Sequence, residues 1–141
     1  MAPGPKDYIF AATRRWMDPD GNGDPSDGID GWRLDVADER PPKFWADWNA
    51  HVRAINPQAY TTAEVWSNPL ELIEHGDFSA CMNYYGFALP VTGFFIDENL
   101  SASAFGRMLD ERRSALPVPV AQGMQNLMDS HDTDRLASMV V

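Results

Sequence analysis

The chain has 141 residues, a formal net charge of -10 and 44% hydrophobic residues. This length suits one small domain and falls short of a complete (β/α)8 barrel, which needs about 250 residues. The acidic balance argues against nucleic acid as a partner, because phosphate binding needs a basic face. No apolar run approaches the roughly 20 residues that span a bilayer. The composition therefore favours a globular domain and is compatible with an uncharged ligand.

The predicted elements alternate between helices and strands. Apolar residues of one segment, from Phe44 to Ile55, recur at helical spacing behind an opening Pro41-Pro42 pair, and Ser101 stands at the N-cap position of a later helix. Helices are predicted at 7–17, 42–55, 69–74, 87–96, 101–116 and 133–140, and strands at 29–35, 60–64, 79–83 and 125–129. Strands that alternate with helices predict parallel βαβ units.

Three of the predicted strands lead into a carboxylate. These carboxylates are Asp35, Glu64 and Asp132. Because the C-terminal ends of parallel strands lie at one rim of a sheet, we expect the three carboxylates to converge there. Arg33 shares one face of its strand with Asp35 and favours the ionised form of that carboxyl. For this pair taken alone, an ordinary salt bridge is the alternative.

Three runs that contain these carboxylates resemble signature segments of the α-amylase superfamily of glycoside hydrolases. They are Gly31-Trp32-Arg33-Leu34-Asp35, Ala63-Glu64-Val65-Trp66 and Asp129-Ser130-His131-Asp132. The runs occur in the family's order, and the resemblance covers nearly the whole chain. Val36-Ala37-Asp38-Glu39 and Ser130-His131-Asp132 lean toward the neopullulanase and cyclomaltodextrinase subgroup.

The resemblance implies an α/β fold that is a fragment of a (β/α)8 TIM barrel. Residues 1–141 would form a partial catalytic domain, from about the third barrel helix through the seventh strand and the start of the following helix. The early segment of the family that completes the glucose-binding end of the cleft would be absent. We therefore expect the chain by itself to be inactive.

The resemblance also implies a retaining hydrolase of α-1,4 or α-1,6 bonds in maltodextrins, cyclomaltodextrins or pullulan. Asp35 would be the nucleophile, Glu64 the general acid and base, and Asp132 the group that binds sugar hydroxyls and stabilises the transition state. Glu64 has no cation nearby in sequence and has Trp66 two residues on, so we expect an apolar surrounding that favours its protonated form.

The resemblance places Arg33, Trp66 and His131 among the substrate-binding residues. For His131 the alternative is a structural histidine bonded to backbone, and for Trp66 it is packing in the core. Further along, Asn83 and Tyr84 are interpreted as structural, with a place in the lining of the cleft as the alternative. For the activity as a whole, the competing hypotheses are a catalytically incompetent fragment and a non-catalytic protein that keeps the fold for sugar binding or assembly. The expected partner is an α-glucan, with no nucleic acid or membrane, and the subgroup implies a homodimeric parent.

The chemistry requires no cofactor, but one loop imitates the start of a calcium site. Asp18, Asp20 and Asn22 stand at alternate positions with Gly23 sixth, as in a calcium-binding loop. Because the twelfth position holds Ile29 instead of an acid, a solvated Asp/Gly turn is the preferred interpretation and calcium binding is the alternative. Cys81, the only cysteine, is predicted to be a small buried side chain.

Overall fold

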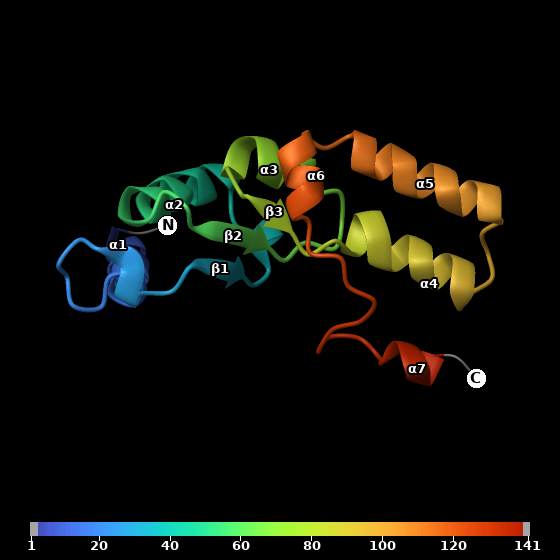
Figure 1. The fold of residues 1–141 in the computed structure, drawn as a ribbon, viewed down its shortest axis with the longest axis horizontal. Helices are drawn as coiled ribbons and strands as arrows, with labels where there is room; N and C mark the ends of the chain where they lie inside the picture. The colour runs from blue at the N-terminus through green and yellow to red at the C-terminus, as the bar shows by residue number, and fades with distance from the viewer. Residues whose placement is uncertain (1–2, 140–141) are drawn as a thin grey trace.

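The computed structural model describes residues 3–139 and contains a small parallel sheet with helices packed against it (Figure 1). No helix within these residues is long and apolar enough to cross a membrane. The helices are α1 (Pro3–Met17), α2 (Pro42–Ile55), α3 (Leu70–Gly76), α4 (Leu89–Phe95), α5 (Ala102–Ser114), α6 (Val118–Gly123) and α7 (Leu136–Met139). The strands are β1 (Gly31–Leu34), β2 (Tyr60–Ala63) and β3 (Ala80–Cys81).

The sheet confirms the predicted βαβ units. Its strand order is β1-β2-β3 and both pairings are parallel. Helix α2 connects β1 to β2, and α3 connects β2 to β3. In the register, Arg33 is paired with Thr62 and Thr62 with Ala80, so these residues lie on one face of the sheet.

The opposite face of the sheet, which carries Trp32 and Leu34, packs on the helices. The Trp32 ring meets the Trp48 ring of α2 edge to face, with 6.1 Å between centroids. Val52 and Ile55 of α2 are also buried in this core. Cys81 is fully buried as expected, and burial raises the pKa of its thiol to about 12, so the thiol stays protonated and unreactive.

Most predicted helices are present with shifted ends. Helix α5 has the expected cap, because the Ser101 hydroxyl accepts a hydrogen bond from Ala104 N at 3.2 Å. Helix α4 is preceded by a π-helical turn (Tyr84–Ala88), at whose start the Asn83 side chain accepts from Gly86 N. Helix α6 was not predicted, because its short proline-rich sequence lacks a helical pattern of apolar residues. Val140, in the last predicted helix, lies outside the described residues.

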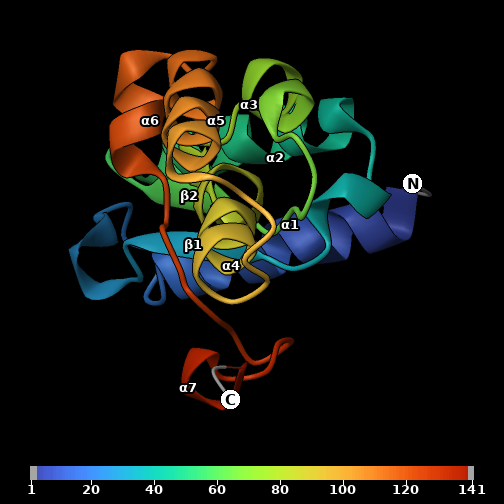
Figure 2. The same cartoon turned by 90° about the vertical axis from the view of Figure 1, so that its right-hand side faces the viewer.

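The predicted strand 125–129 is wrong beyond its first residue. Gln125 forms one parallel bridge with Met82, in which Gln125 N donates to Cys81 O and Asn83 N donates to Gln125 O. Asn83 then begins the π-helical turn, so β3 offers no further edge with which the segment could pair. Figures 1 and 2 both show the chain leaving the sheet here, and α7 standing apart from the other helices.

Candidate active site

One arginine brings two of the predicted catalytic carboxylates together at the end of the sheet. Arg33 Nη1 pairs with Asp35 Oδ1, and Arg33 Nη2 lies 3.2 Å from Glu64 Oε2. The parallel register explains this geometry: Leu34 pairs with Ala63, so Asp35 and Glu64 each follow the last paired residue of neighbouring strands. The expected convergence is therefore present for these two acids.

The two carboxylates differ in exposure and in partners. The Asp35 side chain is 68% exposed, whereas the Glu64 side chain is 6% exposed. Glu64 Oε2 also accepts a hydrogen bond from Val36 N at 2.8 Å, and its Oε1 accepts one from Trp66 Nε1 at 3.2 Å. The expectation of a Glu64 carboxyl without a cation is wrong, because strand pairing supplies Arg33 from 31 positions earlier in the sequence.

Trp66 lies against a second aromatic ring. Its ring stacks on Tyr84 with centroids 3.9 Å apart and planes 10° apart, and Trp66 is 41% exposed. Tyr84 is buried, as its structural interpretation requires, and its hydroxyl donates to Ser130 Oγ at 2.8 Å. The stacking on Tyr84 supports the packing interpretation of Trp66, and stacking of its exposed part on a sugar stays a prediction.

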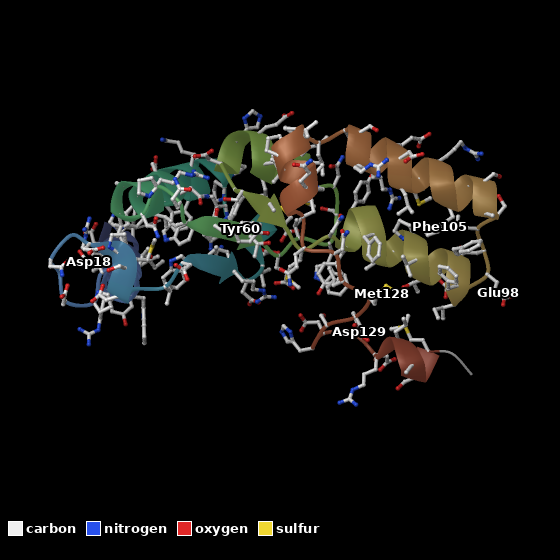
Figure 3. The ribbon with its side chains drawn as sticks, in the orientation of Figure 1. Asp18, Tyr60, Glu98, Phe105, Met128 and Asp129 are labelled. Atoms are coloured by element: carbon white, nitrogen blue, oxygen red, sulfur yellow. The ribbon has the colours of Figure 1, made fainter. Side chains whose placement is uncertain are left out.

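Asp132 and His131 lie in the segment that follows the single bridge. His131 Nε2 is 3.3 Å from Asp132 Oδ2, and both side chains are exposed. Ser130 Oγ accepts a hydrogen bond from Asp132 N at 3.1 Å, and Figure 3 places the neighbouring Asp129 below α4, where the chain runs toward α7. A chain of contacts runs from Glu64 through Trp66 and Tyr84 to Ser130, but convergence of Asp132 with the other two acids stays a prediction.

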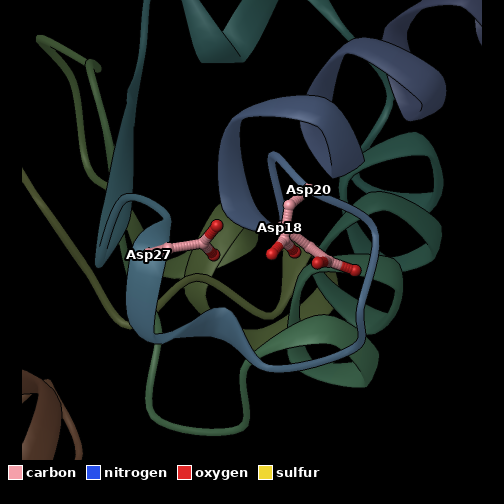
Figure 4. A group of neighbouring side chains, drawn as sticks. All are labelled: Asp18, Asp20 and Asp27. Atoms are coloured by element: carbon pink, nitrogen blue, oxygen red, sulfur yellow. The ribbon is translucent and has the colours of Figure 1, made fainter.

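The calcium-like loop brings together a different set of acids from the one that spacing suggested. Carboxylate oxygens of Asp18, Asp20 and Asp27 lie within 4.8 Å of one another (Figure 4). Asp24 is not among them, because its side chain accepts from Ser26 N and caps a 3-10 turn (Pro25–Asp27) that carries Asp27 back toward the loop. Sequence spacing could not reveal Asp27, since no regular calcium-loop position corresponds to it.

Calcium binding at this cluster stays the alternative to a solvated turn, because three carboxylates supply only part of the 6 to 8 oxygens that calcium takes. Calcium held by these acids would give a calorimetric titration with a Kd of about 10⁻⁴ to 10⁻³ M. Asp27→Asn should abolish the heat, whereas Asp134→Asn, an exposed acid elsewhere, should leave it unchanged. If no heat is measured at millimolar calcium, calcium binding is excluded and the loop is a solvated Asp/Gly turn.

Parallel βαβ units with two carboxylates paired to one arginine are the arrangement expected of an α/β-barrel glycoside hydrolase, and comparison with known proteins shows which enzymes the chain is similar to. No family model matches the chain. It is 38% identical to neopullulanase 2 of Thermoactinomyces vulgaris over 94% of its length and 21% of the relative's. It is 39% identical to a cyclomaltodextrinase of a Bacillus species over 95% of its length and 23% of the relative's.

Solved structures agree with the sequence relatives. The fold matches the cyclic α-maltosyl-(1→6)-maltose hydrolase of Arthrobacter globiformis with a TM-score of 0.87 and 30% identity, over 98% of this chain and 29% of that chain. A cyclomaltodextrinase structure matches with a TM-score of 0.86 and 37% identity, over 99% and 23% of the two chains.

The chain is homologous to part of enzymes of the neopullulanase and cyclomaltodextrinase kind, and its structural neighbours are enzymes of the α-amylase family, so it corresponds to a partial domain. It spans about a fifth of the length of the curated relatives it matches.

Proposed function

We propose that this chain supplies the catalytic carboxylates of a retaining α-glucan hydrolase. The proposed substrates are maltodextrins, cyclomaltodextrins or pullulan, cleaved at α-1,4 or α-1,6 bonds. The observation that carries the proposal is the Arg33 guanidinium, which contacts Asp35 and Glu64 at once. A shared guanidinium is compatible with the separation of about 5 to 5.5 Å between carboxyl groups that retaining glycosidases use.

The two acids would hold opposite protonation states during the reaction. Asp35 is exposed and paired with Arg33, which suits a charged nucleophile that attacks the anomeric carbon and forms a glycosyl ester. Glu64 would protonate the leaving oxygen and then deprotonate the incoming water. Its Oε2 already accepts from Arg33 and Val36, so we place the transferable proton on Oε1, which accepts only from Trp66.

The remaining site residues would act on the sugar itself. The accessible part of the Trp66 ring would stack on a sugar in the leaving-group half of the cleft, while Trp66 also stacks on Tyr84. Asp132 would bind sugar hydroxyls and stabilise the oxocarbenium-like transition state, with His131 donating a hydrogen bond beside it. The Tyr84–Ser130 hydrogen bond supports this placement, because it links the segment that carries Asp132 and His131 to the tyrosine that stacks on Trp66.

The proposed barrel segment runs from about the third helix through the seventh strand and the start of the next helix. In such a segment β1 is an edge of the sheet, and the glucose-binding end of the cleft depends on further strands. We therefore propose that the activity belongs to the completed barrel, in a parent that is a homodimer. A fragment that is inactive, or a protein that only binds sugar or assembles, is the alternative function.

The proposal is tested by exchanging this segment into the Bacillus cyclomaltodextrinase, whose matching segment is 39% identical. We expect the exchanged enzyme to release reducing sugar from cyclomaltodextrin and pullulan, while the isolated chain releases none. Circular dichroism and thermal melting establish that the exchanged enzyme is folded. A folded exchanged enzyme without activity would contradict the proposal, and robust turnover by the isolated chain would contradict the need for a completed barrel.

A further inference from the structure

The backbone at Val36, directly after the proposed nucleophile, adopts an unusual conformation. Val36 has φ 46° and ψ 50°, in the left-handed region that β-branched residues rarely adopt. The residue is 46% exposed, so burial does not explain the conformation. A strained residue beside a reactive group is often part of the site's construction.

The strain coincides with a shift in the hydrogen bonds between β1 and β2. Tyr60 N donates to Asp30 O and Glu64 N donates to Leu34 O, at 3.0 and 2.8 Å, as a parallel ladder requires. The next bond of the same ladder would run from Val36 N to Glu64 O. Instead, Ala37 N donates to Glu64 O at 3.0 Å, one residue later than the ladder predicts.

The one-residue shift frees the amide of Val36. That amide donates to Glu64 Oε2 at 2.8 Å, so successive N–H groups bind the side chain and the backbone carbonyl of one glutamate. Bulges of this kind add a residue at a strand end, re-aim local groups and are frequent next to active sites. The bond fixes Oε2 on the Arg33 side and leaves Oε1 directed to Trp66.

We infer that Val36 is a positioning residue, whose left-handed backbone releases its amide from the β-ladder to orient the Glu64 carboxyl. The inference rests on the proposed function for the role of Glu64, whereas the conformation and the bond can be measured without substrate. Three groups donate to the Glu64 carboxyl: Arg33 and the Val36 amide to Oε2, and Trp66 to Oε1. Among these three donors, the Val36 amide is the one that belongs to the backbone.

The first test compares thermal unfolding of Val36→Gly and Val36→Ala in this chain. Glycine adopts positive φ without penalty, while alanine does not. We expect Val36→Gly to melt about 2 °C above Val36→Ala. In an ordinary extended backbone the order reverses, because glycine loses more conformational entropy on folding. A lower melting temperature for the glycine variant would therefore overturn the assigned conformation.

The second test detects the hydrogen bond by ¹H–¹⁵N NMR of the same chain. The Val36 amide proton should resonate at higher field in Glu64→Gln, because an amide oxygen is a weaker hydrogen-bond acceptor than a carboxylate oxygen. Glu74→Gln, which removes an exposed carboxylate on α3, should leave that resonance unchanged. A Val36 amide that ignores Glu64 would overturn the positioning role. Neither outcome depends on catalysis, so an inactive exchanged enzyme would refute the hydrolase proposal separately.

Discussion

Replacing Asp35 with Asn is expected to lower cyclomaltodextrin hydrolysis by the segment-exchanged enzyme about 10⁴-fold or more. The amide is isosteric with the carboxylate but cannot form the glycosyl ester, so the loss should fall on kcat rather than on KM. Steady-state kinetics with cyclomaltodextrin measures both constants. Because the side chain is exposed and paired only with Arg33, the melting temperature should change little.

The matched control is Asp38→Asn, the same chemical change three residues further on. Asp38 is exposed, and the subgroup that the sequence resembles usually has Asn at this position. We expect this variant to keep activity within a few-fold of the unmodified exchanged enzyme. If Asp35→Asn also stayed within tenfold, Asp35 would not be the nucleophile and the catalytic assignment would have to move to another acid.

Gly31→Ala is expected to have the largest effect on folding. A Cβ atom at Gly31 would lie 2.1 Å from the carbonyl oxygen of Tyr60, its partner in the parallel ladder. The Cβ position is fixed by the backbone of Gly31, and the oxygen belongs to the backbone of Tyr60. Removing the clash therefore requires β1 and β2 to separate. We expect a loss of about 3 kcal/mol in the free energy of unfolding, or a fall of about 10 °C in melting temperature.

Gly106→Ala in α5 provides the comparison for Gly31→Ala. A Cβ atom at Gly106 would meet nothing within 4 Å, and the residue is inside a helix, where alanine is favoured over glycine. We expect this variant to gain about 0.5 to 1 kcal/mol. Thermal and urea unfolding of both variants decide the matter: equal effects would mean that the close approach of Tyr60 to Gly31 does not restrict the strand pair.

The fold was predictable where local pattern and tertiary structure agree. Strands β1 and β2 were correctly placed because each short run of strand-forming residues follows turn residues and leads into a carboxylate. The predicted strand from Gln125 to Asp129 also leads toward a carboxylate but forms only one bridge, at Gln125, since the chain at Asn83 leaves the sheet. A strand needs a partner edge, and the sequence of the strand itself does not contain that information.

The site was predictable to the level of residue type and family order, but not in its contacts. Spacing within one strand indicated the pairing of Arg33 with Asp35, and the structure confirms it. The contact of Arg33 with Glu64 depends on the register between strands, and the Val36 amide depends on a positive φ. Neither feature leaves a periodic signal in the sequence, because valine is an unfavourable residue for such a turn.

The shared guanidinium has a consequence for electrical balance through the proposed cycle. Before bond cleavage, Asp35 carries the negative charge and Glu64 the proton; once the glycosyl ester forms, Asp35 is neutral and Glu64 is ionised. In both stages one anion faces one immobile cation, because Arg33 reaches both acids from a single position. Charge would thus migrate between neighbouring strands while its total stays constant, so no mobile counterion has to enter or leave as the sugar is transferred.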